Sequence, residues 1–432
     1  MALQLLALSL AAAIPKAGSA HLRPNLAQSI LLNDAVHTHG ARCLDGSPQR
    51  IWLQRSQSAS AANRSKWYFH FMGGGWCRSE PECIQRAYDP KQCYRGSSSL
   101  DCFNANDDLE PGKTFNETMD FRNVPCINGA RWGGGLLMNT PETNPLTHDW
   151  NKVEIVYCDG GSYAGNQGEV SRVSYGGRDD LPLYYRGQRN LDATIDYLVK
   201  HEGLGDATHF LVSGDSAGGL ATIWHADYFR TLLPKASVLA VPDSGFFYGD
   251  ASKPAWPAAL RWMAETMNFT AGLDRSCVEA ATKAGVSPAT ACTLPEDVMP
   301  FVEVPTFVLN SRFDPALRSF ADNSPSFAEV GDHLLSKVKS SALRSQRNAA
   351  FITACSEHCG QWAQGQILPG HNDFNVTIDG WTAASAVDAW AGSLWSGSPF
   401  PRQLWLQNAS YPCKTCCSGG DALIEMAHMP QT

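Results

Sequence analysis

The chain has little charge of either sign and no excess of positive charge. Only 18% of its 432 residues are charged, and the formal net charge at pH 7 is −8. Nucleic acids and anionic membrane surfaces attract basic proteins, so this balance argues against either one as the main partner. Internal repeats, coiled-coil heptads and low-complexity tracts are also lacking. We therefore expect an ordinary globular protein with a large core.

Long apolar runs are scarce except at the very beginning of the chain. Residues 1–14 are almost wholly apolar, Pro15 interrupts them, and residues 18–20 are small enough for a cleavage site. No lysine or arginine precedes this run, but the pattern predicts a signal peptide over residues 1–20. No later stretch approaches 18 apolar residues, so we expect a soluble mature protein without a membrane span.

Cysteine, in contrast, is abundant. Fourteen cysteines are spread over the whole chain, a density typical of proteins exported to an oxidising compartment. A cytosolic protein with many free thiols is the alternative. Five sequons for N-glycosylation agree with export, at Asn63, Asn116, Asn268, Asn375 and Asn408. We expect a secreted, disulfide-bonded glycoprotein.

A recurring pattern indicates the fold class. Short runs of apolar, β-branched and aromatic residues each lead into a polar turn or motif, at residues 67–72, 153–158, 210–213, 306–310 and 349–354. Amphipathic helical patterns, such as the one over residues 191–199, lie between them. Continuous apolar runs are typical of strands that are buried on both faces of a parallel sheet. The alternation predicts a doubly wound and mostly parallel sheet, with its site at the carboxyl ends of the strands. The serine motif described below makes the expected fold α/β-hydrolase-like.

Two segments interrupt this alternation. Residues 89–145 are rich in asparagine, glycine, proline and cysteine, and residues 266–300 contain Cys277 and Cys292. We interpret both segments as disulfide-rich insertions. The rest of the mature chain, residues 21–432, is predicted to form one domain that carries them.

The most informative motif is Gly-x-Ser-x-Gly around Ser216. An apolar run precedes it, and a helix-compatible stretch over residues 220–232 follows it. In this motif the serine occupies a sharp turn between strand and helix, and the flanking glycines remove Cβ atoms that would clash there. A glycine-rich phosphate or packing turn is the alternative, but it does not explain the partners described next. We predict that Ser216 is a nucleophile.

A serine hydroxyl is a weak nucleophile without a base, and the base needs an acid to orient it. In α/β-hydrolases the acid and then the base follow the serine along the chain. Asp314 comes just after the run 306–310, and His358 comes directly after the run 349–354. This order favours a triad of Ser216, Asp314 and His358 over a helix-capping role for Asp314 and a surface-loop role for His358.

Other histidines and a metal site are the alternatives to this triad. Three further histidines follow the serine at a useful distance along the chain, but none comes directly after a strand-like run: His333, His371 and His428. Cys355, His358 and Cys359 could in principle bind zinc. However, a fourth ligand is not evident, and thiols in an exported chain more often form disulfides. We expect no metal.

Acyl transfer also needs hydrogen-bond donors for the negative charge that develops on the carbonyl oxygen. The glycine turn over residues 73–75 supplies closely spaced backbone N–H groups, and the N–H of Ala217 completes the predicted oxyanion hole. A phosphate-binding loop is excluded because no Lys-Ser/Thr pair follows the glycines. Trp76, Asp159 and Ser162 stand at neighbouring strand ends and are candidate substrate-binding residues, although Asp159 and Ser162 also fit a purely structural turn.

Several segments taken together resemble the pectin acetylesterase/Notum family. They are residues 43–48, 73–77, 157–160, 216–220, 243–247, 310–314, 355–359 and 411–413. The matches run in order through nearly the whole mature chain, and plant-type pectin acetylesterases are the most similar in pattern. The chain departs from the family at Met72, where a glutamate usually precedes the glycines, and at Asp215, where a cysteine usually precedes the serine. Neither change removes a predicted catalytic group.

The resemblance implies a secreted carboxylesterase that uses the triad named above, with oxyanion donors at Gly74, Gly75 and Ala217 and with no metal or organic cofactor. The implied substrate is an acetylated cell-wall polysaccharide such as pectin. A Notum-like protein deacylase and an esterase related to hormone-sensitive lipase, which shares the Gly-Asp-Ser-Ala-Gly-Gly motif, are the enzymatic alternatives. A catalytically silent binding or adhesion protein is the non-enzymatic alternative, which the complete triad disfavours.

Overall fold

The structure is a computed structural model that describes residues 26–106, 109, 112–119, 126–127, 130–131, 135–137, 139, 141, 144–250, 254–320, 325–359, 376–413 and 416–417. The predicted signal peptide, His371 and His428 lie outside these residues. Within this part of the chain, no helix combines the length and the apolar character that a membrane crossing requires.

In the described part of the chain, ten strands form one sheet in the order β14-β13-β12-β11-β10-β3-β7-β2-β1-β4. Their bounds are β1 Ala27–Leu31, β2 Arg50–Gln54, β3 Lys66–Phe71, β4 Thr118–Met119, β7 Asn151–Ile155, β10 His209–Asp215, β11 Ser237–Asp243, β12 Phe307–Ser311, β13 Ala349–Thr353 and β14 Leu404–Leu406. All neighbours from β7 to β14 are parallel. The predicted fold class is confirmed.

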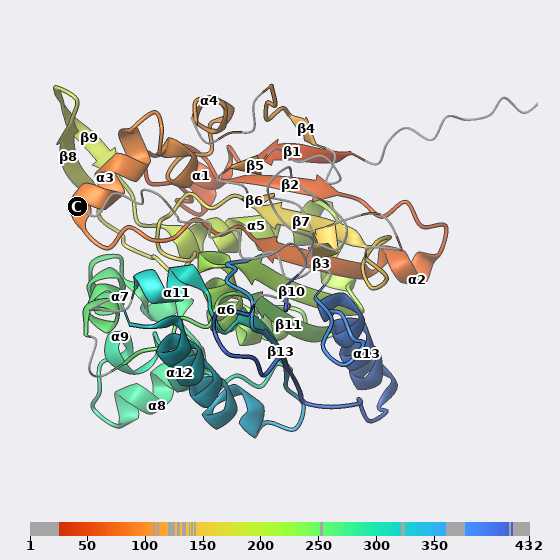
Figure 1. Ribbon diagram of the computed structural model, residues 1–432. Helices are drawn as coiled ribbons and strands as arrows, with labels where there is room; N and C mark the ends of the chain where they lie inside the picture. Colours follow the sequence, from red (N-terminus) through yellow and green to blue (C-terminus); the bar gives the residue numbers. More distant parts are fainter. Residues whose placement is uncertain are drawn as a thin grey trace, which may run out of the picture.

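An antiparallel edge, which we did not predict from the sequence, completes the sheet. β2 pairs antiparallel with both β7 and β1, and β1 pairs antiparallel with β4. Figure 1 shows β1 and β2 on the opposite side of β3 from β10 and β11. A second unpredicted feature is the hairpin of β8 (Ser171–Tyr175) and β9 (Arg178–Leu183), which projects beside α3 in Figure 1.

Helices fill the connections between the strands. Their bounds are α1 Ala35–Thr38, α2 Ala61–Arg64, α3 Glu80–Tyr88, α4 Leu100–Asn104, α5 Gly187–His201, α6 Ala217–Leu232, α7 Ala255–Thr266, α8 Arg275–Lys283, α9 Pro288–Ala291, α10 Pro295–Val298, α11 Pro315–Ser319, α12 Phe327–Ser340 and α13 Ala383–Ser396. The 3-10 turns are η1 Cys93–Arg95, η2 Gly135–Leu137, η3 Leu204–Asp206, η4 Phe269–Gly272 and η5 Ala342–Arg344. The helical patterns predicted over residues 191–199 and 220–232 lie in α5 and α6.

The centre of the core joins β3, β10 and α6. The rings of Phe69, Phe210 and Phe229 contact one another with centroid separations between 4.8 and 6.1 Å, and all three side chains are buried. Burial of one such side chain stabilises the fold by about 1.5–3 kcal/mol. All five residues of β12 and of β13 are buried as well, which explains why these strands appear as continuous apolar runs.

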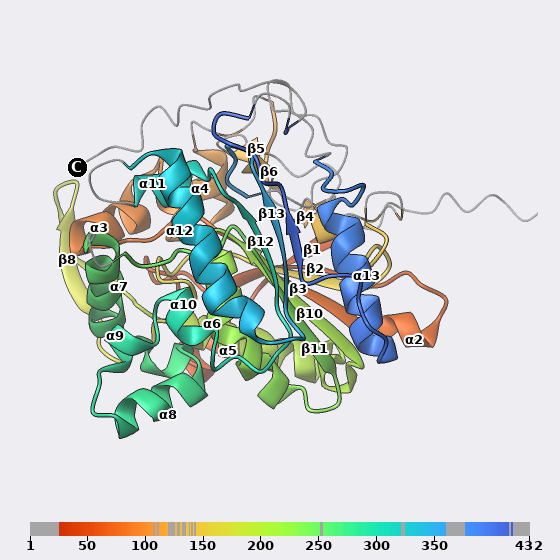
Figure 2. The ribbon, with the colours of Figure 1, turned by 60° about the horizontal axis from the view of Figure 1, so that its bottom comes forward.

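The two segments that we interpret as insertions, residues 89–145 and 266–300, each contain a disulfide. The described part of residues 89–145 contains η1, η2, α4 and the short strands β4, β5 (Cys126–Ile127) and β6 (Ala130–Arg131). Residues 266–300 contain η4 and α8–α10, and Figures 1 and 2 both show α7, α8 and α9 grouped beside α12. The disulfides formed by described residues are Cys43–Cys158, Cys77–Cys83, Cys93–Cys102, Cys277–Cys292, Cys355–Cys417 and Cys413–Cys416.

Candidate active site

Ser216 occupies the turn between β10 and α6, with φ at 53° and ψ at −118°. This left-handed backbone is unusual for a residue with a Cβ atom and signals a constrained turn. The neighbouring glycines are required by close packing. A Cβ atom on Gly214 would lie 2.3 Å from the carbonyl oxygen of Gly218, and one on Gly218 would lie 2.0 Å from the carbonyl oxygen of Phe71. The two glycines therefore allow the serine turn to pack directly against the end of β3.

The three residues predicted as a triad meet at the carboxyl ends of β10, β12 and β13. Oγ of Ser216 is 2.8 Å from Nε2 of His358, and Nδ1 of His358 is 2.8 Å from Oδ2 of Asp314. Among the described histidines, only His358 contacts Ser216. His333 lies on α12, where its Nδ1 is 3.4 Å from a carboxylate oxygen of Asp250. The distances are those of a nucleophile, a base and an orienting acid.

Asp314 combines this contact with a cap on α11. Its Oδ1 accepts hydrogen bonds from the backbone N–H groups of Ala316 and Leu317 at 2.7 and 3.3 Å, while Oδ2 binds His358. The side chain is completely buried. Helix capping, which the sequence presented as an alternative to the triad, therefore coexists with it, because the two carboxylate oxygens serve different partners. The cap also fixes the carboxylate that faces the imidazole.

Charges around His358 decide its protonation. Burial disfavours the charged imidazolium, but the charge and the hydrogen bond of Asp314 outweigh it, and Asp215 and Asp243 add to the effect. The net result is a pKa of His358 above its ordinary value. The adjacent Glu357 has a pKa of about 7, raised by burial and by the negative charge of Asp243. Negatively charged side chains around His358 therefore favour its protonated form.

The loop that carries His358 is tied down on both sides. Cys355 forms a disulfide with Cys417, and the backbone N–H of Cys359 donates to Oγ of Ser244 at 2.9 Å. Cys355 and Cys417 also lie close to Glu357 in a group whose side-chain types could hold a metal ion. Their sulfur atoms are joined in the disulfide, so they are not thiolate ligands while that bond is intact.

The glycine turn after β3 lies against the serine turn. Gly74 and Gly75 have φ angles of 147° and 66°, which a side chain would strain. Arg86 donates to the carbonyl oxygen of Gly74 at 2.9 Å, and the hydroxyl of Tyr157 donates to that of Gly75 at 2.7 Å. These two donors fix the orientation of the carbonyl groups in the turn, and in the described part of the chain the N–H groups of Gly74 and Gly75 form no hydrogen bond, unlike that of Gly73, which donates to Asp215. Ala217 is the first residue of α6, where N–H groups have no intrahelical acceptor.

The candidate substrate-binding residues differ in their surroundings. Ser162 is buried, accepts a hydrogen bond from Nε1 of Trp76 at 2.7 Å and donates to the carbonyl oxygen of Ala217 at 2.7 Å. Asp159 is buried too and accepts from the backbone N–H groups of Gly161 and Tyr163, and burial raises its pKa to about 7. The contacts of Asp159 and Ser162 match the structural turn that the sequence presented as the alternative.

Trp76 belongs to a cluster of four aromatic rings, which we call the aromatic cluster: Trp76, Phe247, Trp256 and Phe320. Every pair of these rings is in contact, with centroid separations between 4.7 and 5.9 Å. The ring of Phe247 also lies 6.0 Å from the imidazole of His358. Sequence reasoning missed three of the four rings. The Gly-Phe-Phe segment that follows β11 was the one available signal, because it also stands at a strand end.

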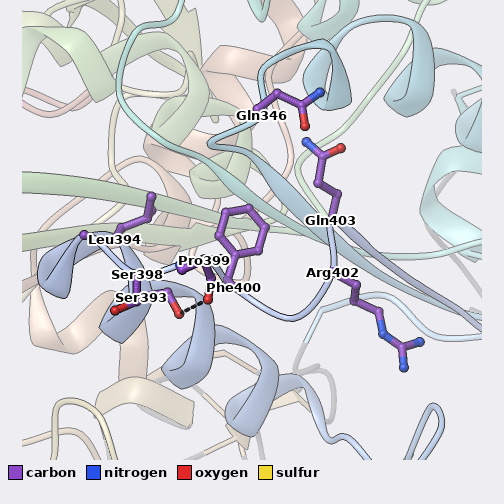
Figure 3. A pocket seen from close by; sticks show the side chains of 9 residues that line it. Gln346, Ser393, Leu394, Ser398, Pro399, Phe400, Arg402 and Gln403 are labelled. Atoms are coloured by element: carbon purple, nitrogen blue, oxygen red, sulfur yellow. Dashed lines mark hydrogen bonds between the residues drawn. The ribbon is translucent and has the colours of Figure 1, made fainter.

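A hollow of about 430 Å³ lies at the amino ends of the strands, opposite to the ends that carry Ser216, Asp314 and His358. Its lining residues precede β13 and β14 or end α13, whereas the triad follows the carboxyl ends of the strands. The residues are Gln346, Ser393, Leu394, Gly397, Ser398, Pro399, Phe400, Arg402 and Gln403. Figure 3 shows the ring of Phe400 at this hollow, with the amides of Gln346 and Gln403 nearby. The hollow is therefore separate from the candidate active site.

Comparisons with known proteins identify the relatives of this chain. Residues 23–105 and 127–328 match the model of the pectinacetylesterase family, and these segments include Ser216 and Asp314 but not His358. Pectin acetylesterase 5 of Arabidopsis thaliana is 27% identical over 424 residues, which cover 92% of this chain and 86% of that protein. Human palmitoleoyl-protein carboxylesterase NOTUM is 25% identical over 55% of this chain and 40% of its own length.

The fold has counterparts among solved structures. The Wnt deacylase Notum from Drosophila superposes with a TM-score of 0.66 at 22% identity, and the match covers 92% of this chain and all of that one. At this identity the likeness shows the shared α/β-hydrolase fold. The matched family model, which spans more than half of the chain, shows the relationship itself. This chain is a carboxylic ester hydrolase and belongs to the pectinacetylesterase family.

Proposed function

We propose that the protein is a secreted serine esterase that removes acetyl groups from a cell-wall polysaccharide such as pectin. The observation that carries the proposal is the line of hydrogen bonds from Ser216 through His358 to Asp314, each 2.8 Å long, beside a glycine turn in a member of this family. The pectin acetylesterases of Arabidopsis thaliana among its relatives support the choice of substrate.

In the proposed reaction, Nε2 of His358 accepts the proton of Ser216 while Oγ attacks the carbonyl carbon of the acetyl ester. The carbonyl oxygen becomes an oxyanion, which the N–H groups of Gly74, Gly75 and Ala217 stabilise. The ester C–O bond then breaks, and the departing sugar oxygen takes the proton from His358. An acetyl group remains bound to the serine.

The second half of the reaction repeats these steps with water. Nε2 of His358 accepts a proton from a water molecule, whose oxygen attacks the acetyl carbon. The bond between the carbonyl carbon and Oγ breaks, Oγ recovers the proton, and acetate leaves. Throughout both halves Asp314 keeps Nδ1–H of His358 directed toward itself, so that Nε2 stays free to exchange protons.

The aromatic cluster supports a short acyl group. The ring of Phe247 lies 6.0 Å from the imidazole of His358, and the other three rings pack against Phe247, so bulky side chains stand beside the proposed base where a long acyl chain would need space. Replacing the half-buried Phe320 with alanine is expected to raise kcat/KM for an octanoyl ester, relative to an acetyl ester, by about tenfold or more. The measurement compares p-nitrophenyl acetate, butyrate and octanoate.

Phe400→Ala is the matched control for Phe320→Ala, because Phe400 is a half-buried phenylalanine at the hollow by the amino ends of the strands. This variant should leave the preference among the esters unchanged. If Phe320→Ala also leaves the preference unchanged, the cluster does not limit the length of the acyl group.

The raised pKa of His358 predicts the pH dependence of the enzyme. Only the neutral imidazole can accept a proton, so activity is present above the pKa of the folded protein and is lost as the pH falls through it. Because the pKa lies above the ordinary value of 6.5, half-maximal kcat/KM is expected above pH 6.5. A profile for p-nitrophenyl acetate hydrolysis at constant ionic strength measures this. A midpoint below pH 6.5 would contradict the role assigned to Asp314 and its acidic neighbours.

The substrate class is tested by the release of acetate. Acetylated pectin, acetylated xylan, chitin and a palmitoleoylated peptide are offered side by side, with enzyme inactivated by a serine-directed phosphonate as the blank. Release of acetate from pectin at the highest kcat/KM supports the proposal. Cleavage of the palmitoleoyl ester without release of acetate from any polysaccharide would instead support the protein-deacylase alternative.

We also propose that residues 1–20 are a signal peptide and that residues 21–432 form one catalytic domain with two insertions. The six disulfides among the described residues support export. Three of the sequon asparagines, Asn116, Asn268 and Asn408, have exposed side chains, as glycosylation requires. Asn63 is half-buried, and its Nδ2 donates to Asp149 at 2.6 Å. Asn375 lies outside the described residues.

A further inference from the structure

The carboxylate of Asp215 joins three segments that surround the nucleophile. Its Oδ1 is 3.1 Å from Nε2 of His70 and accepts a hydrogen bond from the backbone N–H of Gly73 at 3.2 Å. The thiol of Cys359 also faces this carboxylate, whose negative charge contributes to raising the pKa of the thiol. Asp215 directly precedes Ser216 in the chain, and 30% of its side chain is exposed. One side chain thus connects the serine turn, the glycine turn and the loop of the base.

The first of these contacts, with His70, favours the charged form of the imidazole. Its Nδ1 is 3.0 Å from the hydroxyl of Tyr68, so the ring is oriented from both sides. Burial disfavours the imidazolium, but the hydrogen bond and the charge of Asp215 outweigh it, and Glu154 and Asp243 contribute, so the pKa of His70 is raised. A charged imidazole binds a carboxylate more tightly than a neutral donor does. His70 therefore holds Asp215 in place.

The contact with Gly73 sets the position of the glycine turn. A Cβ atom on Gly73 would lie 2.5 Å from Oδ2 of Asp215 and 3.1 Å from Cβ of Ser216, so the backbone of the turn rests directly on these two residues. Gly74 and Gly75, the proposed oxyanion donors, follow at once. A shift of the Gly73 N–H would therefore move both donors relative to the nucleophile.

Cys359 links the same carboxylate to the base. It is the residue after His358, and burial, together with the negative charges of Asp215, Asp243 and Asp314, raises the pKa of its thiol well above the ordinary value. The thiol therefore stays protonated and can donate its hydrogen to Asp215. Because the backbone of Cys359 is also bound to Ser244, the loop of the base has a second anchor at this point.

We propose that Asp215 is a positioning residue for the esterase reaction, which holds the oxyanion donors and the base at their working distances from Ser216. The inference rests on the proposed function, because it takes Gly74 and Gly75 as donors. Hydrogen-bond donors stabilise an oxyanion strongly only when they are fixed in advance at the place where the charge develops. A loop released by about 1 Å can lower the rate about 10²-fold without any change in the residues that react.

The test is Asp215→Ala in the full chain. We expect kcat for p-nitrophenyl acetate to fall about 10²-fold with little change in KM. The affinity for a short-chain trifluoromethyl ketone, whose adduct with serine carries an oxyanion, should fall by the same factor. If the alanine variant does not fold, Asp215→Asn decides, with an expected loss in kcat of about tenfold because a neutral amide binds His70 less tightly.

Asp227→Ala is the matched control. Asp227 lies on α6 and holds a neighbouring loop by the same chemistry, because its carboxylate accepts from the backbone N–H groups of Glu303 and Val304 at 3.0 and 2.8 Å. This variant should lower the melting temperature and leave kcat and inhibitor affinity unchanged. If the Asp215 variant also loses only stability, Asp215 has no positioning role.

The proposed function can fail separately from this inference. Turnover that survives in Ser216→Ala would contradict the proposed function itself. Wild-type kcat and inhibitor affinity in the folded Asp215 variant, while Ser216→Ala is inactive, would remove only the role assigned to Asp215.

Discussion

Replacing Ser216 with alanine is expected to lower kcat for an acetyl ester by about 10⁶-fold, the loss that removal of a triad serine causes in other serine hydrolases. The reason is that the acyl-enzyme cannot form, so only binding and the oxyanion donors remain to assist a direct attack by water. The measurement is p-nitrophenyl acetate hydrolysis at high enzyme concentration, followed beside the uncatalysed rate.

A covalent label provides the control for this variant. Wild-type enzyme treated with a fluorophosphonate should gain the mass of one adduct, and Ser216→Ala should gain none. Alanine and serine tolerate the backbone φ of 53° at position 216 similarly, so the variant should keep the melting temperature of wild type. Substantial turnover in a folded, unlabelled variant would place the nucleophile elsewhere.

Asp314→Asn is expected to lower kcat about 10⁴-fold with little loss of stability. The amide can present its NH₂ group to Nδ1 of His358 and thereby favour the tautomer that carries its proton on Nε2, which cannot accept the proton of Ser216. The amide oxygen can still accept the hydrogen bonds from Ala316 and Leu317, so the cap on α11 survives. Rate constants and thermal unfolding measured on one preparation separate the two roles.

Asp314→Ala distinguishes the carboxylate's two functions further. This variant loses the cap as well as the contact with His358, and loss of a cap typically costs about 1 kcal/mol. It should therefore be as inactive as Asp314→Asn but less stable. Equal stability of the two variants would show that the cap contributes nothing, and wild-type kcat in Asp314→Asn would show that another acid orients the base.

The three residues of the proposed triad could be predicted to meet from the sequence because of a general property of parallel sheets. Strands that run in the same direction end at the same edge, so polar residues that follow buried runs are brought together there. Ser216, Asp314 and His358 each follow such a run, and the structure places them in contact. Equally local patterns predicted the helix after the serine and the disulfide-rich character of the chain.

The antiparallel edge could not be recognised in the same way. β2 has the sequence Arg-Ile-Trp-Leu-Gln, and its polar ends do not suggest a buried strand. Arg50 is nevertheless buried, because its side chain donates to the carbonyl oxygen of Ser98 and to Glu117. Those partners lie about fifty or more residues further along the chain. Only the folded structure shows that they satisfy the arginine.

The linear sequence by itself determined which residue types stand at the strand ends, and hence the chemistry of a serine, a base and an acid. The tertiary structure alone decided what surrounds them. His70 meets Asp215 because β3 and β10 pair in parallel with Ser213 opposite His70, and the same register seats Gly73 on the serine turn. Such contacts join residues more than a hundred positions apart, so they depend on the register and packing of whole strands, which no local pattern encodes.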